Sequence, residues 1–375
     1  MAPVKNWQLD RNMEYSYEEN RPKKQLAYVF DTNKCIACQT CTVACKTTWT
    51  SGEGQEAMFW NNVETKPYGF YPTAWDVKIL DQLGSQEWND KTYAGKTVFE
   101  AAPPGERVLG YLPGDSDYAN PNLGEDEIAG TLDQGAFFQG VHNAWMFYLA
   151  RICNHCTYPA CLAACPRKAI YKREEDGVVL IDQSRCRGYK ECVKACPYKK
   201  TFFNMVTRTS EKCIGCYPLL EKGEQPRCVQ TCIGKIRLQG WLSKPEEAQP
   251  DNPLDYIVHI KKVALPLYPQ YGTEPNVYYI PPIQVPRDFL LQMFGPHSDE
   301  AIKTYKAVKE DPKLLAAFLL FGSSPKTITK FDYNEKEAIG FNENNEELVR
   351  VPLIEPFFER DFFDAKLEVY RHNTP

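Results

Sequence analysis

The run CIACQTCTVAC, residues 35–45, carries four cysteines at the spacing C-x2-C-x2-C-x3-C. Three thiolates at this spacing can hold one iron–sulfur cluster, while the fourth reaches a second cluster. A tight loop brings the first three sulfurs around one cluster, and the residue four positions further on begins a helix that points away. Zinc sites usually use two separated cysteine pairs, so this run favours iron and sulfide over zinc.

Three further stretches hold all the remaining cysteines. CNHCTYPACLAACP (153–166) and CRGYKECVKACP (186–197) end in the Cys-Pro pair of ferredoxin motifs, and the fourth stretch has the spacing C-x2-C-x11-C-x3-C. The third stretch lacks its second cysteine and has Tyr189 there. The candidate ligands are Cys35, Cys38, Cys41, Cys45, Cys153, Cys156, Cys161, Cys165, Cys186, Cys192, Cys196, Cys213, Cys216, Cys228 and Cys232.

Fifteen cysteines in four motifs predict four clusters, of which one has a ligand too few. Three thiolates suit a [3Fe–4S] cluster, and the other three motifs then predict [4Fe–4S] clusters. Tyr189 would lie at the vacant corner, either as a phenolate ligand of a fourth iron or, as we favour, as a side chain that excludes it. The missing thiolate should ease reduction, and basic neighbours would act in the same direction: Arg185, Arg187, Lys190 and Lys194.

Composition limits the function classes. Lys plus Arg is 44 and Asp plus Glu is 49, so the net charge of −5 argues against a general nucleic-acid binder. The longest apolar run, Leu314 to Phe321, is far shorter than the ~18 residues of a membrane span. Residues 1–20 contain no apolar segment, so we expect a soluble chain without its own signal peptide. The clustered cysteines of a large chain also argue against a disulfide framework.

An internal repeat supports the cluster motifs. VFDTNKC (29–35) resembles LIDQSRC (180–186), and Leu26, Tyr28 and Phe30 alternate with their neighbours as in a strand. Each unit therefore predicts a strand, a cluster loop and a short helix that starts near the last cysteine. We expect an α+β fold with two ferredoxin-like two-cluster domains. Because the fourth cysteine of a motif reaches a second cluster, the outer motifs should pair with each other and the inner motifs likewise.

Four segments follow from these motifs. Residues 1–45 form an N-terminal arm with the first motif, and 46–149 a long insertion with little regular structure that contacts a partner. Residues 150–240 hold the remaining motifs, and complete a four-cluster core with 25–45. Residues 241–375 form a C-terminal extension that packs on the core and on a catalytic subunit. We expect the early aromatic residues of the insertion to pack in a core or an interface.

Within the C-terminal extension, residues 264–282 should run extended, and two helices should follow. The first is expected near 299–309. The second should start at Asp311-Pro312 and stop at Gly322, with an apolar face that includes Leu314 and Phe318. His155 lies inside a cluster loop, where it could hydrogen-bond a sulfur or a partner's cofactor, and His142 is a weaker candidate.

The four motifs together resemble the iron–sulfur beta subunits of type II molybdenum enzymes of the DMSO reductase family. That group includes respiratory nitrate reductase, nitrite oxidoreductase, selenate and perchlorate reductases, and ethylbenzene dehydrogenase. The chain most resembles nitrite oxidoreductase beta subunits, although some of these have Asp where this chain has Cys45. The stretches that carry the likeness are NWQLDRNMEYSYEENRPKKQ (6–25), WNNVETKPYGFYP (60–72), RICNHCTYPACLAACPRKAIYKR (151–173), ALPLYPQYGTEPNVYYIPP (264–282) and QMFGP (292–296).

The resemblance implies which cysteines share a cluster. Three [4Fe–4S] clusters would be held by Cys35, Cys38, Cys41 and Cys232; by Cys45, Cys213, Cys216 and Cys228; and by Cys153, Cys156, Cys161 and Cys196. Cys165, Cys186 and Cys192 would hold a [3Fe–4S] cluster beside Tyr189. Relatives usually have a residue that is not a ligand at this place, which favours the excluding role of the tyrosine.

The resemblance also implies partners and a role. The chain would be a non-catalytic electron-transfer subunit between a catalytic alpha subunit, which holds molybdenum bis-MGD, and a haem-b gamma subunit or cytochrome c. Its complex would oxidise nitrite to nitrate. The alternatives are a nitrate, selenate or perchlorate reductase and an ethylbenzene-type hydrocarbon dehydrogenase. An extracytoplasmic location by co-export with the alpha subunit is implied, and the cytoplasmic face of the membrane is the alternative.

Overall fold

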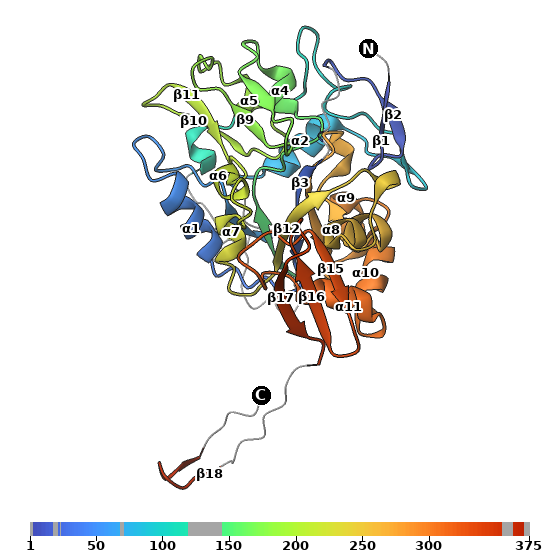
Figure 1. The fold of residues 1–375 in the computed structure, drawn as a ribbon. Helices are drawn as coiled ribbons and strands as arrows, with labels where there is room; N and C mark the ends of the chain where they lie inside the picture. Colours follow the sequence, from blue (N-terminus) through green and yellow to red (C-terminus); the bar gives the residue numbers. More distant parts are fainter. Residues whose placement is uncertain are drawn as a thin grey trace, which may run out of the picture.

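A four-stranded mixed sheet lies at the centre of the computed structural model, which describes residues 3–17, 22, 24–67, 71–118, 145–354 and 363–370 (Figure 1). The strand order is β12-β3-β14-β13. Strand β3 (Gln25–Asp31) runs antiparallel to β12 (Arg237–Leu242) and parallel to β14 (Val277–Ile280), and β13 (Leu265–Pro266) runs antiparallel to β14. The sheet therefore joins the first cysteine motif, the end of the fourth motif and the C-terminal third of the chain.

The side chains of β3 alternate between the two faces of the sheet, as expected around residue 28. Tyr28 and Phe30 face the larger hydrophobic core, whereas Ala27 and Val29 face a second core on the opposite side of the sheet. All seven residues of β3 are buried. The expected strand is thus confirmed, and it is a central strand covered on both faces, because its side chains alternate between two separate cores.

Each cysteine motif contains a short helix, and these helices begin earlier than we expected. Helices α1 (Thr40–Trp49), α4 (Ala160–Ala164) and α5 (Glu191–Ala195) start five residues before the last cysteine of their motifs, not near it. The cause is visible in two loops, where Gln39 (φ 58°) and Lys190 (φ 61°) adopt the left-handed conformation and turn the chain into its helix. The fourth motif contains two shorter helices, α6 (Tyr217–Leu220) and α7 (Arg227–Gln230).

The helices pack in the pairs that the crossing of the motifs predicts. Helix α1 of the first motif packs on α7 of the fourth, and α4 of the second motif packs on α5 of the third. Two antiparallel hairpins adjoin the inner pair, formed by β8 (Ile170–Lys172) with β9 (Val179–Ile181), and by β10 (Thr201–Asn204) with β11 (Thr209–Lys212) (Figure 1). Strand β9 confirms the strand expected near residue 180. The division into two separate ferredoxin domains stays a prediction.

The segment 46–149 has more regular structure than we expected. Strand β4 (Asn62–Lys66) pairs antiparallel with β7 (Phe147–Arg151), and helix α2 (Trp75–Leu83) follows β4. Trp60, Tyr71 and Trp75 are buried, which confirms the expected packing for these three aromatic residues. Tyr68, Phe70 and His142 lie outside the described residues.

Strand β4 was not predicted from the sequence, because its buried residues include charged side chains. The Lys66 ammonium lies 2.6 Å from the Asp76 carboxylate, and the Arg151 guanidinium lies 2.6 Å from Glu64. All four side chains are buried. Paired charges of this kind replace the apolar residues by which a buried strand is normally recognised in a sequence.

The C-terminal third contains both expected helices and one more. Helix α9 (Arg287–Phe294) precedes α10 (Ser298–Lys306) and α11 (Pro312–Leu319). The Asp311 side chain caps α11 by accepting a hydrogen bond of 3.0 Å from the Leu314 amide. Leu314 and Phe318 pack in the core behind the central sheet, so this apolar face is covered by the chain itself.

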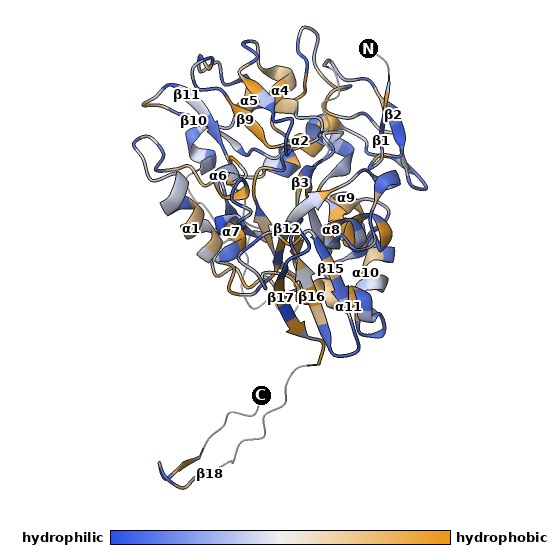
Figure 2. Cartoon of the chain, in the orientation of Figure 1, coloured by the Kyte–Doolittle hydropathy of each residue, from blue (hydrophilic) through white to orange (hydrophobic). Residues whose placement is uncertain are grey.

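The remaining elements lie towards the periphery. Strands β15 (Lys330–Tyr333), β16 (Glu337–Phe341) and β17 (Glu347–Pro352) form an antiparallel sheet. Figure 2 shows mainly hydrophilic residues on the outer strands β1 and β2. Among the described residues, no helix combines the length and the apolar character needed to cross a membrane. The other elements are β1 (Val4–Asn6), β2 (Arg11–Met13), β5 (Trp88–Asn89), β6 (Thr92–Tyr93), α8 (Pro253–Asp255), β18 (Phe363–Asp364), β19 (Val369–Tyr370), a π-helical turn (Tyr256–Ile260) and 3-10 helices at Asp115–Tyr118, Pro245–Glu247, Pro269–Tyr271 and Val308–Glu310.

Candidate iron–sulfur cluster sites

The four cysteine loops share one backbone feature. The residue before the second cysteine position is left-handed in every motif: Ala37 (φ 53°), His155 (φ 42°), Gly188 (φ 66°) and Gly215 (φ 64°). A left-handed residue bends a short loop back on itself, so that the side chains around it converge. Tyr189, which follows Gly188, occupies in its loop the position that Cys38 occupies in the first.

Cysteines from the first and fourth motifs surround a first cavity. Cys35, Cys38 and Cys41 line it together with Cys232, which is distant in sequence. Cys38 is exposed and Cys41 is buried, so this group reaches the protein surface on one side. The guanidinium Nη2 of Arg237 donates a hydrogen bond of 3.0 Å to the Cys41 Sγ.

A second cavity is lined by Cys45 and by three cysteines of the fourth motif, Cys213, Cys216 and Cys228. All four are buried. The indole Nε1 of Trp49 donates to the Cys216 Sγ at 3.3 Å. Donors to a sulfur stabilise its negative charge, which raises the reduction potential of a cluster that the sulfur ligates.

A third cavity is lined by Cys153, Cys156 and Cys161 from the second motif and by Cys196 from the third. The Lys200 amide donates to the Cys196 Sγ at 3.5 Å. The first three groups in the structure are therefore the sets that the family resemblance implies. The structure brings these sulfurs together, and their ligation of iron is taken up below as a proposal.

The three remaining cysteines adjoin the third group. Burial, with the neighbouring Cys165 and Cys186, raises the pKa of Cys192 to about 12. The amides of Ala169 and Ser210 each donate at 3.3 Å, to the sulfurs of Cys165 and Cys186 respectively.

The Tyr189 side chain is 61% exposed. In the described chain it therefore lies at the surface instead of filling a closed space. Its role in excluding a fourth iron stays a prediction.

The physical state of these thiols suits a positively charged iron–sulfide core. All fifteen cysteines are free of disulfide bonds. Burial raises the pKa of Cys228 to about 12 and the pKa values of Cys45 and Cys161 well above the usual range, so their thiolates need a cation beside them. Within the described residues, no three acidic, histidine or cysteine side chains are arranged to hold a single metal ion. Sulfurs around a cavity fit a polynuclear cluster better than one zinc ion.

Shared hydrophobic packing connects the four groups. Cys41 of the first group and Cys228 of the second belong to one core, against which Cys156 and Cys196 of the third group also pack. Cys45 and Cys213 of the second group pack in a smaller core with Cys153 of the third. Cys161 of the third group packs with Cys165 and Cys192 of the fourth. The second and third groups thus lie between two groups that have an exposed residue, Cys38 at one end and Tyr189 at the other.

His155 is buried, with 1% of its surface exposed, so the expectation that it reaches a partner's cofactor is wrong. Its Nδ1 accepts a hydrogen bond of 3.1 Å from the Val179 amide, which leaves the proton of the neutral ring on Nε2. That nitrogen has no hydrogen-bond partner among the described residues and lies against Gly215, in the loop of the second group. A hydrogen bond from His155 to a sulfur there stays a prediction.

Three of the four basic side chains near Tyr189 contact a carboxylate or an aromatic ring of this chain. Lys194 lies 2.7 Å from Glu106, and Arg185 lies 3.4 Å from Asp182. Lys190 packs over the ring of Phe203.

The sequence prediction did not include Trp49 and Arg237, two side chains that donate to cluster-site sulfurs, although both follow a motif's last cysteine by four or five residues. That proximity is the only signal that could have found them.

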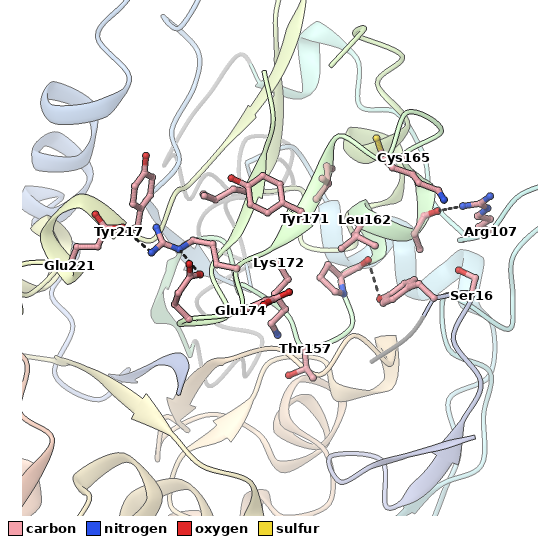
Figure 3. Close-up of a pocket in the computed structure, with 18 residues that line it drawn as sticks. Ser16, Arg107, Thr157, Leu162, Cys165, Tyr171, Lys172, Glu174, Tyr217 and Glu221 are labelled. Carbon is pink, nitrogen blue, oxygen red and sulfur yellow. Dashed lines mark hydrogen bonds and ion pairs between the residues drawn. The ribbon is translucent and has the colours of Figure 1, made fainter. Parts of the chain in front are cut away.

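A broad cavity of about 1010 Å³ lies beside the fourth group, with Cys165 among its lining residues (Figure 3). Its two arginines are engaged with neighbours: Arg173 lies 2.9 Å from Glu221, and Arg107 donates to the Ala163 carbonyl at 3.2 Å. Because these groups do not converge on one point in the cavity, we assign no ligand to it.

Comparison with known proteins identifies the family. Residues 144–241 match the model of a 4Fe-4S dicluster domain. The chain is 45% identical over 309 residues to the selenate reductase subunit beta of Thauera selenatis, an alignment covering 75% of this chain and 90% of the relative. The chain belongs to the iron–sulfur beta subunits of DMSO-reductase-family molybdoenzymes.

Two further relatives lie in the same family. The perchlorate reductase subunit beta of Dechloromonas aromatica (strain RCB) is 41% identical over 331 residues, which cover 84% of this chain and 90% of the relative. The respiratory nitrate reductase 1 beta chain of Escherichia coli (strain K12) is 35% identical over 358 residues, with 70% of each chain covered. This beta subunit is therefore an electron-transfer protein that carries iron–sulfur clusters, in a mixed helix and strand fold with a ferredoxin-type dicluster domain.

Proposed function

We propose that this beta subunit carries electrons through three [4Fe–4S] clusters and one [3Fe–4S] cluster held by the four cysteine groups. The observation that carries the proposal is that each of three cavities is lined by four cysteines drawn from two different motifs. When bound, such clusters take up and release single electrons. The chain's own residues hold them in a row, bury all four cysteines of the second group and donate hydrogen bonds to the sulfurs.

The two ends of the row are the places where electrons would enter and leave. Cys38 of the first group is exposed, and Ile36 and Ile233 beside that group are each 64% exposed. At the other end Tyr189 is exposed. One end would contact an alpha subunit that holds molybdenum bis-MGD, and the other end would contact a haem-b gamma subunit or cytochrome c. The complex would lie outside the cytoplasm, by co-export of this chain with the alpha subunit, or alternatively on the cytoplasmic face of the membrane.

Iron and acid-labile sulfide analysis of the purified chain tests the cluster assignment. About fifteen irons and sixteen sulfides per chain are expected, because one of four clusters lacks an iron. Stoichiometric zinc with little sulfide would overturn the assignment. The variant Cys216→Ala should lose cluster iron. Arg350→Gln is the control and should retain all iron, because Arg350 lies in β17, which contains no cysteine.

For the reaction of the whole complex we propose oxidation of nitrite to nitrate. Its support is the likeness of five stretches of sequence, from residues 6–25 to 292–296, to nitrite oxidoreductase beta subunits. The relatives named above include beta subunits of selenate, perchlorate and nitrate reductases, so reduction of an oxyanion is the second candidate. The two differ in the direction of electron flow through the row.

The native complex distinguishes these reactions. Nitrite-dependent reduction of an artificial electron acceptor is expected, with nitrate formed in proportion to the acceptor reduced. Selenate, perchlorate and an aromatic hydrocarbon serve as parallel substrates with the corresponding donor or acceptor. Turnover of one of these, with none of nitrite, would refute nitrite oxidation and leave the cluster assignment intact.

A further inference from the structure

Arg237 is a buried cation at the start of β12. Only 1% of its surface is exposed, and its guanidinium carbon lies 4.3 Å from the centre of the Phe30 ring. Nη2 donates to the Cys41 Sγ at 3.0 Å and lies 3.5 Å from the amide oxygen of Asn61. Nε and Nη1 are buried and have no hydrogen-bond partner among the described residues.

The charge of Arg237 is not balanced by a carboxylate in the described part of the chain. Arg151 is a useful comparison, because it is equally buried and lies 2.6 Å from the Glu64 carboxylate. An isolated buried cation strongly destabilises a protein unless an anion faces it. Arg237 instead lines the first cavity together with Cys35, Cys41 and Cys232, and the charge of the Cys228 thiolate also favours its protonated form, which raises its pKa.

Those cysteines belong to two different groups. Cys41 lines the first cavity with Arg237 itself, whereas Cys228 lines the second. Cys41 and Cys228 pack in one hydrophobic core with Phe30, and the Arg237 guanidinium lies over the Phe30 ring. Arg237 therefore lies at the first cavity and against the core that it shares with the second, and its Nε and Nη1 donors have no hydrogen-bond partner among the described residues.

We propose that Arg237 is a shared counter-cation of the first two clusters and raises both of their reduction potentials. The inference rests on the proposed function, because it needs clusters at these cavities. Reduction adds one negative charge to a cluster, and a fixed cation beside it stabilises that charge. The hydrogen bond that Arg237 Nη2 donates to the Cys41 sulfur raises the potential as well. The third and fourth groups lie further along the row and should be little affected.

Redox titration of the assembled complex, monitored by EPR, tests the inference with the variants Arg237→Gln and Arg237→Lys. In Arg237→Gln, the ratio of reduced to oxidised first and second clusters at a fixed potential should fall at least tenfold, equivalent to about 59 mV for one electron. Arg237→Lys keeps the charge and should restore most of the loss. Arg350→Gln on exposed β17 removes an equal charge and should change neither potential.

Equal shifts of all four clusters, or no shift, in Arg237→Gln would overturn the inference. So would an Arg237→Lys protein as impaired as the glutamine variant, because charge would then not be the cause. If Arg237→Gln fails to assemble, wild-type complex with guanidino-15N arginine supplies the measurement. Pulsed EPR of the reduced first cluster should show 15N coupling that Arg237→Lys abolishes, and absence of coupling in the wild type refutes the contact.

Iron analysis separates the two levels of failure. If the wild-type protein lacks about fifteen irons, the proposed function itself fails. If the irons are present while the potentials do not respond to Arg237 and no 15N coupling is seen, only the inference about Arg237 fails.

Discussion

The change Tyr189→Cys should convert the proposed three-iron cluster into a [4Fe–4S] cluster. Its loop has the backbone of a complete motif, because Gly188 and Lys190 are left-handed like Ala37 and Gln39 on either side of Cys38. Forcing Lys190 into that conformation would cost about 1 to 2 kcal/mol, which would lower the occupancy of a new ligand position by a factor of roughly 5 to 30, whereas Gly188 adopts it without that cost. Here that cost is absent, so we expect nearly complete conversion.

Two measurements follow the conversion. Iron should rise by one, from about fifteen to about sixteen per chain, and the near-isotropic EPR signal of the oxidised three-iron cluster should disappear. Tyr189→Phe is the matched control, because it removes the phenol oxygen without adding a thiolate and should leave the signal in place. A full three-iron signal in Tyr189→Cys would show that this residue does not lie at the vacant corner. A wild-type protein without the signal, in which Tyr189→Phe makes the signal appear, would instead indicate phenolate ligation of a fourth iron.

Two further predictions concern the ligand sets and the fold. Cys196→Ala should damage a [4Fe–4S] cluster and spare the three-iron EPR signal, and loss of the three-iron signal alone would contradict the crossing of the inner motifs. Asp76→Ala should lower the free energy of unfolding by about 3 to 5 kcal/mol, measured by denaturant titration, because it leaves the buried Lys66 ammonium without its 2.6 Å partner. The exposed pair of Lys91 and Glu300 provides a control, since Glu300→Ala should change stability by at most about 1 kcal/mol; equal effects would refute the argument from burial.

The parts of the fold that were predictable from sequence are those with a local pattern. The alternation around Tyr28 predicted β3, and the Asp311-Pro312 pair predicted the start of α11, where the Asp311 side chain caps the helix. Both depend on neighbouring residues only. The pairing of the helices followed from the reach of the fourth cysteine, which is also a local property.

The features that sequence could not predict depend on contacts between distant residues. Strand β4 is held by charges that pair with α2 and β7, so its buried face has no apolar pattern. Arg237 lies beside Cys41 only because β12 pairs with β3. His155 was expected to hydrogen-bond a sulfur or a partner's cofactor, and the Val179 amide and the Gly215 loop enclose it, which excludes the partner's cofactor.

The central sheet has a consequence for how the chain is made. Strand β3 follows the N-terminal arm, whereas its parallel neighbour β14 begins at Val277. At about 5 to 20 residues per second, a ribosome needs roughly 12 to 50 s to travel from the first cysteine to that strand. Throughout this interval β3 lacks a neighbour on one edge, and the first loop is also without Cys232 for most of it. With the proposed ligand set, cluster insertion at this end of the row must therefore wait until the chain has been made at least to Cys232, and a nascent chain exposes reactive thiols that need protection from oxygen until then.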